Sequence, residues 1–191
     1  MTPDPERANN FAALGTTSTV RLLKSQGQWK LPGSRTMVTI CTYNARTLAS
    51  ESSIEDLLMQ ARKIRNDVIG LAETRRRHLF NAVYDTGEEM FPGTCDSRGV
   101  GGVGVLVNTS LSVNIDAFEQ LTTRIGHLRL KRCGSTPALT IFVFYAPTSN
   151  YDEELEAFYM DLERFYKEDH RPKTSWSSLE IICLDRTKKV V

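Results

Sequence analysis

Apolar and polar residues follow two different periods in the first part of the chain. MVTICTY (37–43) predicts a strand that runs into Asn44, and apolar residues then recur at helical spacing, at Ile54, Leu57, Leu58, Ala61 and Ile64. Ser52 and Glu55 have the spacing of a capping box and predict the start of this helix. The next run, DVIGLA (67–72), is almost wholly apolar, which predicts a short strand buried on both faces and ending at Glu73.

The middle of the chain predicts antiparallel strands followed by a second helix. Short runs separated by turn-forming residues occur at NAVYD (81–85), GVGVLVN (102–108), LSVNID (111–116) and HLRLKRC (127–133). LTIFVFYA (139–146) is the most apolar run and predicts a central strand. A helix is expected after Ser149 or Asn150, with the apolar stripe Leu155, Phe158, Tyr159, Leu162, Phe165 and Tyr166. This order of elements indicates a mixed α/β (α+β) fold in which helices cover sheet faces.

The patterns divide the chain into three parts. Residues 1–36 are polar and punctuated by Gly and Pro, so we expect a disordered N-terminal tail. Residues 37–168 contain the periodic segments and form the predicted domain. In residues 169–191 Pro172 ends the helical pattern, and we expect a divergent C-terminal tail with one strand-like run, LEIICL (179–184).

Composition narrows the classes of function. The 191 residues carry 24 Lys and Arg against 23 Asp and Glu, a net charge of +1, so any site for a polyanion must be local. Four cysteines at irregular spacing, Cys41, Cys95, Cys133 and Cys183, argue against zinc and fit reduced thiols. With no signal-peptide pattern and no apolar run of membrane-spanning length, we expect an intracellular protein, nuclear or cytoplasmic, with no membrane partner. The oligomeric state stays open.

Several polar residues follow the predicted strands and could form a site. Glu73 is a hard oxygen ligand of the kind that Mg²⁺ accepts, and Asn44 and Tyr145 could hydrogen-bond a phosphate. Arg75, Arg76 and Arg77 could grip nucleic-acid phosphates beside Glu73. Taken alone, Glu73 fits a solvated loop residue and Asn44 a turn former better than a site. Tyr145 fits a core or rim aromatic equally well, and the three arginines alone are weak evidence because they fit a solvated loop.

Glycines at 99–104 (GVGGVG) match the spacing of a dinucleotide-binding loop. A strand follows them and no helix opens there, so we expect glycines that let a strand pack closely or bulge. The sequon at Asn108 is discounted because no secretory signal accompanies it.

Four segments in order carry a resemblance: CTYNARTL (41–48), DVIGLAETRRR (67–77), GGVGVLVN (101–108) and IFVFYAPTS (141–149). Over about residues 37–168 the chain resembles the N-terminal half of the endonuclease/exonuclease/phosphatase superfamily. It is most similar to the apurinic-type endonuclease domain of RTE-like non-LTR retrotransposons, and craniofacial development protein 2-like sequences are similar too.

The resemblance implies a fold and a chemistry. The fold would be a partial four-layer α/β/β/α sandwich whose C-terminal half is missing. The activity would be hydrolysis of phosphodiesters that depends on Mg²⁺ (or Mn²⁺), with DNA as the ancestral substrate. By the same resemblance Glu73 would bind the metal, Asn44 would lie at the metal and phosphate, and Tyr145 would contact the scissile phosphate.

The chain departs from the superfamily in its last part. The G-D-F-N motif, whose aspartate activates the attacking water, and the final Asp-His pair are absent, and Asp169-His170 comes too early to replace the latter. We therefore expect little or no activity, strand faces with too little cover, and a marginally stable chain. A shifted reading frame near SSLEI (177–181) would account for the lost pattern.

Two other functions stay open on sequence. The chain could be a non-catalytic fragment that binds nucleic acid or protein, holding metal or nucleic acid weakly through Glu73 and Arg75–Arg77. It could also be a phosphatase of the same superfamily that acts on small or lipid phosphates.

Overall fold

The computed structural model describes residues 24–30, 37–48, 50–77, 81–131, 138–147, 152–169 and 177–183. In chain order the elements are β1 (Lys24–Lys30), β2 (Met37–Asn44), the 3₁₀ helix η1 (Ala45–Thr47), α1 (Glu51–Ile64), β3 (Val68–Ala72), β4 (Ala82–Val83), β5 (Glu89–Phe91), β6 (Val103–Val107), α2 (Thr109–Ser112), β7 (Ile115–Gln120), β8 (Ile125–Leu130), β9 (Ala138–Phe144), α3 (Asp152–Asp169) and β10 (Ser177–Cys183).

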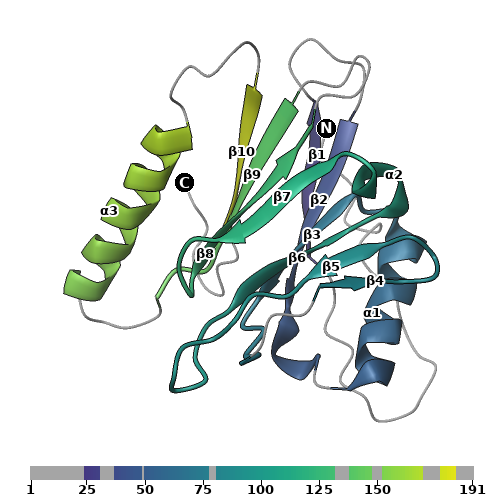
Figure 1. Cartoon of the computed structure of the whole chain (residues 1–191), viewed down its shortest axis with the longest axis horizontal. Coiled ribbons are helices and arrows are strands. Elements are labelled where there is room, and N and C mark those ends of the chain that lie inside the picture. The colour runs from purple at the N-terminus through teal and green to yellow at the C-terminus, as the bar shows by residue number, and fades with distance from the viewer. Residues whose placement is uncertain are drawn as a thin grey trace, which may run out of the picture.

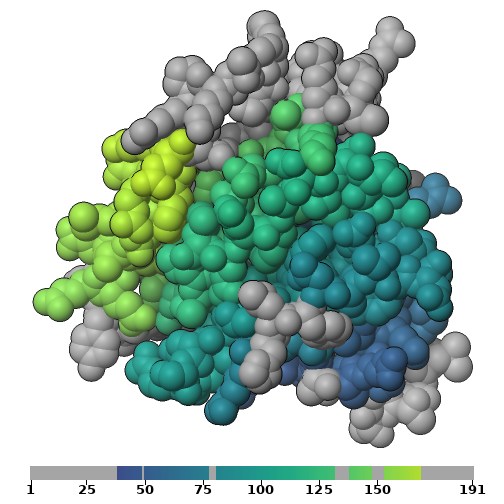
Figure 2. All heavy atoms as spheres, in the orientation of Figure 1, coloured from purple at the N-terminus to yellow at the C-terminus, as the bar shows by residue number. Residues whose placement is uncertain are grey.

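The strands form two sheets that pack face to face. One sheet has the order β1-β2-β3-β6-β5-β4 and the other the order β10-β9-β8-β7. The pair β2 and β3 is parallel and is connected through α1, whereas β3–β6 and β8–β9 are antiparallel. Figure 1 shows α1 and α3 on opposite outer sides of the two sheets, and the space-filling view in Figure 2 shows the same arrangement of α3, sheets and α1. The molecule is thus a layered mixed α/β sandwich.

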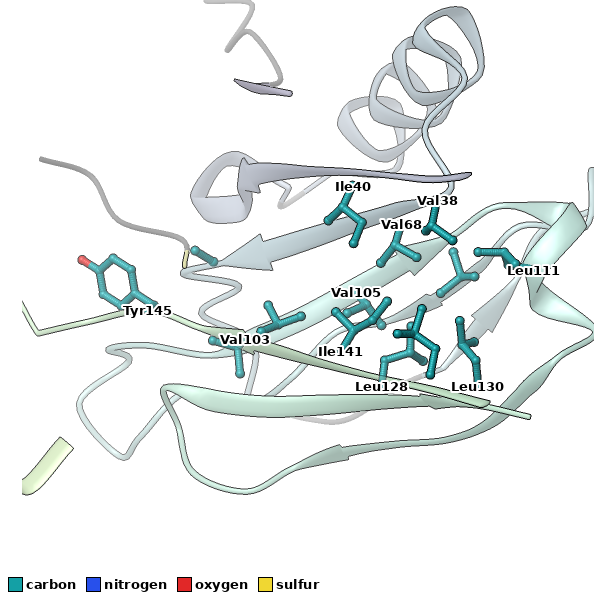
Figure 3. Close-up of a cluster of buried hydrophobic side chains, with 14 residues drawn as sticks. Val38, Ile40, Val68, Val103, Val105, Leu111, Leu128, Leu130, Ile141 and Tyr145 are labelled. Carbon is teal, nitrogen blue, oxygen red and sulfur yellow. The ribbon is translucent and has the colours of Figure 1, made fainter. Parts of the chain in front are cut away.

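Three apolar clusters hold these layers together, and the pleat of the strands explains how. Val68 and Ala72 of β3 face the other sheet, while Ile69 and Leu71 face α1, so this strand is buried on both faces as predicted. On β9, Ile141 and Val143 face the first sheet, and the alternate residues, such as Phe142, face α3. The cluster between the sheets is drawn in Figure 3.

Two expectations from the sequence are wrong in detail. The capping box of α1 is formed by Ser50 and Ser53, each side chain accepting the other's backbone N–H at 3.2–3.3 Å, and not by Ser52 and Glu55. LSVNID is not one strand. Leu111 lies in α2, because the side chain of Asn108 accepts a hydrogen bond from Leu111 N and so caps that short helix.

The expectation of uncovered strand faces is also wrong. Every residue of β3 is buried, and the described residues from Leu139 to Phe144 of β9 are buried as well. Phe142 and Phe144 lie on the outer face of β9 and form one cluster with Phe158 of α3, whose ring packs against Phe144. Helix and sheet together therefore give both apolar strands a full set of neighbours.

The two sheets extend past the limits predicted for the domain. Strand β1 lies within residues 1–36 and pairs with β2, and β10 lies within residues 169–191 and pairs with β9. The predicted boundaries at 36/37 and 168/169 stay predictions, because most of the flanking residues lie outside the described part. In that part no helix combines the length and apolar character needed to cross a bilayer.

Cys41 agrees with the expectation of a reduced, buried thiol. Its side chain is fully buried, and burial raises the pKa of the thiol to about 12, an effect that the Asn66 side chain at 2.8 Å partly offsets. A thiol with so high a pKa stays protonated and is a poor nucleophile. The side chains of Cys133 and Cys183 lie outside the described residues.

The packing of α1 gives a first testable prediction. Leu57 is 1% exposed between α1 and the sheet, so Leu57→Ala should lower the free energy of unfolding by about 2–5 kcal/mol. Met59 lies on the same helix but is 61% exposed, and Met59→Ala should change it by less than about 0.5 kcal/mol. Urea denaturation followed by circular dichroism measures both values. A broad, non-cooperative transition of the unaltered chain would contradict a packed core.

Candidate functional site

Two neighbouring parallel strands end side by side and bring Asn44 and Glu73 together. In the register of β2 and β3, Asn44 lies opposite Ala72, and Glu73 is the next residue along the chain. Asn44 Nδ2 donates a hydrogen bond to Glu73 Oε1 at 3.1 Å. The sequence placed both residues at strand ends, and the structure puts them in direct contact at one edge of the sheet.

Glu73 is a buried carboxylate in an unusual backbone conformation. Its residue is only 5% exposed, and its φ of 54° lies in the left-handed region that residues with a side chain rarely adopt. The second oxygen, Oε2, lies 3.5 Å from Nη2 of Arg75, which also has a positive φ, of 51°. Buried charges require partners, and here an amide and a guanidinium provide them.

The Asn44 amide is held at both ends. Its Oδ1 accepts a hydrogen bond from Arg46 N at 3.1 Å and so caps η1, while its Nδ2 faces the Glu73 carboxylate. Both groups are therefore fixed before any ligand arrives. The geometry makes Asn44 an orienting partner of Glu73.

Tyr145 comes from the opposite sheet and lies at the same end of the sandwich. It directly follows β9, is 8% exposed, and its ring closes one end of the cluster between the sheets. Figure 3 shows its hydroxyl pointing away from that cluster, to which Val103 also belongs. Val103 is the register partner of Ala72, which immediately precedes Glu73. The three predicted site residues thus converge on one end of the molecule.

Arg124 supports Tyr145 from the hairpin loop between β7 and β8. The carbonyl oxygen of Arg124 accepts a hydrogen bond from Tyr145 N at 2.9 Å, and its guanidinium carbon lies 5.7 Å from the centroid of the tyrosine ring. Nη2 of the same side chain is 3.1 Å from Oε1 of Glu154 on α3. Arg124 therefore places a cation beside Tyr145 and connects it to the outer helix.

The basic run after Glu73 divides into three different environments. Arg75 contacts Glu73, Arg76 donates to the carbonyl of Leu48 at 3.0 Å and is partly buried, and Arg77 is exposed. Contact of these arginines with nucleic-acid phosphate stays a prediction. Arg46, exposed and next to Asn44, adds another cation at this edge.

Two residues at the site, Thr74 and Arg124, were not predicted from the sequence. Thr74 is buried beside Glu73 and donates its hydroxyl to Gly93 O at 2.5 Å, while Arg124 reaches Tyr145 across the hairpin loop. Nothing local distinguishes Thr74 or Arg124 from other loop residues. Only the pairing of distant strands gives them their roles.

Other places in the described chain offer weaker candidates. A pocket of about 360 Å³ opens near the start of β3, where Arg62, Asp67 and Asn108 line it. Each of these side chains is bonded within the protein, Arg62 to Glu88, and Asn108 to Asp67 at 2.7 Å. Among the described residues no group of three or more His, Cys, Asp and Glu is arranged to hold a metal ion.

Comparison with known proteins places the fold. No family model matches the chain, and no curated protein matches it in sequence. Among solved structures, the AP endonuclease LMAP from Leishmania major superimposes with a TM-score of 0.51 at 14% identity, covering 66% of this chain and 46% of that one. The endonuclease domain of TRAS1, a telomere-specific non-LTR retrotransposon, gives a TM-score of 0.48 at 14% identity, covering 75% and 56%. An endonuclease/exonuclease/phosphatase family protein from Leptotrichia buccalis gives 0.48 at 13%, covering 75% and 65%.

The likeness to the AP endonuclease confirms the predicted mixed α/β fold. The two sheets of this chain match part of the fold of that protein. It spans about half the length of the solved AP endonuclease. At this level of identity the comparison shows the fold alone, and the chemistry of the site depends on the residues that this chain places there.

The contact between Asn44 and Glu73 gives a second prediction. Asn44→Ala leaves a buried carboxylate oxygen without its donor and should lower the free energy of unfolding in EDTA by about 1–3 kcal/mol. Asn44→Ser, which keeps a cap for η1 but is too short to reach Glu73, should cost nearly as much. Asn114→Ala is a control outside the site, with an expected change below about 0.5 kcal/mol. Full rescue by Asn44→Ser would show that the cap alone matters.

Proposed function

We propose that the chain is a divalent-metal-dependent phosphodiesterase module of the endonuclease type, with DNA as its ancestral substrate and little catalytic activity of its own. The observation that carries this proposal is the 3.1 Å contact between Asn44 and the buried Glu73 at the ends of two neighbouring strands. Open α/β sheets bind ligands at the carboxyl ends of their strands. The sequence resemblance and the fold also support a metal-dependent phosphodiesterase module.

The residues at Glu73 suit Mg²⁺ or Mn²⁺. Mg²⁺ is commonly held by one or two carboxylates with water completing its shell, and Glu73 offers a carboxylate that the Asn44 amide N–H holds in place. The Arg75 contact at 3.5 Å is longer than a charge-assisted hydrogen bond, and its side chain is 41% exposed, so a metal can displace it. Held by Glu73, such an ion would supply polarisation of a phosphoryl oxygen and would stabilise charge on the leaving oxygen.

The protein's own groups would position the substrate. Asn44 holds the Glu73 carboxylate in one orientation, and the Tyr145 hydroxyl, which points away from the core, would donate to a phosphate oxygen. Arg46, Arg75 and Arg77 supply local positive charge that the net charge of +1 does not reveal. By the resemblance, the aspartate of a G-D-F-N motif activates the attacking water and the histidine of a final Asp-His pair stabilises the transition state. Neither motif is found at its expected place in these 191 residues, so we expect slow cleavage by this stretch of chain.

A metal titration and a nicking assay test the proposal together. We expect Mn²⁺ binding by calorimetry that Glu73→Gln abolishes, because the amide removes the charged ligand. On supercoiled plasmid, with and without abasic sites, Mg²⁺-dependent nicking should be slow and should vanish in Glu73→Gln. Cleavage that persists in Glu73→Gln, or metal binding that ignores it, would place the chemistry elsewhere. Fast cleavage that depends on Glu73 would support the metal site and contradict only the proposed low activity.

Arg75 gives a separate prediction about the metal. The Arg75 guanidinium lies 3.5 Å from the Glu73 carboxylate, so it repels a cation that binds there. Arg75→Gln should therefore tighten Mn²⁺ binding by about ten-fold, the effect of removing a like charge at short range. Arg77→Gln, at an exposed position in the same run, is the matched control and should change it by less than about three-fold. Equal effects of the two variants would argue against a specific competition at Glu73.

A second candidate is a nucleic-acid binding fragment without catalysis. The exposed Arg46, Arg75 and Arg77 at one edge of the sheet favour it. Binding of this kind weakens steeply with salt, with a slope near −0.9 per phosphate contact on duplex DNA. A DNA shift assay titrated with salt detects it, and its independence of Mg²⁺ and of Glu73→Gln would distinguish it from the metal-dependent function.

A further inference from the structure

The glycine-rich run, which the sequence predicts to allow close packing or a bulge, lies between the two halves of the site. We refer to residues 99–102 (G-V-G-G) as the glycine loop. It precedes β6 and contacts the segment after β3 on one side and the β7–β8 hairpin loop on the other. These two segments carry Glu73 and Arg124, so the loop touches the support of both Glu73 and Tyr145.

On one side the glycine loop holds the backbone after Glu73. Thr74 N donates to Gly102 O at 3.1 Å, and Arg75 N donates to Gly101 O at 3.2 Å. Both donors lie between the Cα atoms of Glu73 and Arg75, whose positive φ angles are strained conformations for residues with side chains. These backbone hydrogen bonds hold the strained segment in place.

On its other side the glycine loop reaches the second sheet. Gly102 N donates to Thr123 O at 2.8 Å, and the next residue, Arg124, accepts the hydrogen bond from Tyr145 N at 2.9 Å. Three successive hydrogen bonds therefore run from Thr74 through Gly102 and the hairpin loop to Tyr145. Because they join backbone atoms, small side-chain movements do not break them.

The loop has no room for a side chain at its centre. Gly101 and Gly102 have φ of 83° and 89°, a region that favours glycine. A Cβ on Gly102 would lie 2.2 Å from Thr74 Oγ1, and one on Gly101 would lie 2.9 Å from Thr123 O. The glycines thus permit a contact between three segments that any larger residue would push apart.

A further clamp fixes the same segments. Gln120, at the end of β7, accepts from Thr94 N and donates to Thr94 O, both at 2.7 Å. The neighbouring Gly93 accepts the hydroxyl of Thr74 at 2.5 Å. The side chain of Thr74 is thereby anchored to a segment that is itself tied to the second sheet.

We propose that the glycine loop is a positioning element, which sets the placement of Glu73 relative to Tyr145 by joining the two sheets at their shared end through Thr74, Gly102 and Thr123. The importance of that placement for phosphodiester chemistry rests on the proposed function. The coupling itself does not, because it follows from hydrogen bonds present without metal or DNA. Gly102 and Thr74 are its positioning residues.

Fluorine NMR of the chain labelled with 3-fluorotyrosine tests the coupling without metal or DNA. Among the six tyrosines, the Tyr145 resonance is assigned from its loss in Tyr145→Phe. Gly102→Ala and Thr74→Val alter the segment after Glu73, and both should shift the Tyr145 resonance. Thr74→Ser, which keeps the hydroxyl that Gly93 accepts, should restore its original position.

Gly87→Ala is the matched control. Gly87 also has a positive φ, of 88°, and a Cβ there would lie 2.7 Å from Thr109 Cγ2, but it lies near α2, away from the site. It should leave the Tyr145 resonance in place. An unmoved resonance in folded Gly102→Ala and Thr74→Val, or an equal shift in Gly87→Ala, overturns the proposal. If Gly102→Ala fails to fold, the Thr74→Val and Thr74→Ser pair decides.

A second arm separates this inference from the proposed function. Mn²⁺ bound at Glu73 should broaden the Tyr145 resonance, and the broadening should change in Thr74→Val and return in Thr74→Ser. Without any Mn²⁺ effect in the unaltered chain, the proposed metal site fails while the metal-free shifts still decide the coupling. Where nicking is measurable, Thr74→Val should lower kcat more than it raises KM, because alignment and not binding is lost.

Discussion

The site depends on keeping one carboxylate buried at the edge of a sheet. An ionised side chain removed from water needs hydrogen bonds and opposite charge, and Glu73 receives them from Asn44 and Arg75. Its φ of 54° adds a second demand, because the backbone must be held in a conformation that it would not choose alone. The neighbouring loops meet that demand with backbone hydrogen bonds to Thr74 and Arg75. Charge and strain thus converge on one residue.

The order of the strands explains why the partner groups are available there. The β2–α1–β3 connection makes two strands parallel neighbours, so their carboxyl ends, Asn44 and Ala72, meet at the same edge. The antiparallel β6 then returns beside β3 and brings the glycine loop to that edge. The second sheet contributes the end of β9 and so Tyr145. One end of the sandwich therefore collects chain segments that are far apart in sequence.

Sequence patterns predicted the parts of this arrangement that depend on local periodicity. The continuous apolar run that buries Val68–Ala72 on both faces and the apolar stripe of α1 could be predicted because both are local patterns of the sequence. Asn44 and Glu73 were singled out because each follows an apolar strand, and the parallel pairing of β2 and β3 explains their contact. The start of α1 was misplaced by two residues, because serines stand at positions 50, 52 and 53 and any of them can accept a helix N–H.

Long-range features escaped prediction for a physical reason. The contacts of Gly102 with Thr74 and Thr123 join three loops that no sequence period relates, and the hydrogen bond of Arg76 to Leu48 O joins one of these loops to a fourth segment. The GVGGVG spacing pointed correctly to close packing, but the partner of a glycine cannot be read from the glycine. Such contacts arise from the tertiary fold, so they become visible only when the register of distant strands is known.

Both outer helices reach the site through the residues that they support. On the first sheet, α1 packs on Ile69 and Leu71, and so fixes the strand whose end carries Glu73. On the second, α3 holds Phe144 through Phe158, and its Glu154 holds Arg124 beside the ring of Tyr145. Because each helix stabilises the strand that delivers one group, loosening either layer displaces one half of the site. The two halves of the site are connected to each other between the sheets, by the hydrogen bonds of the glycine loop.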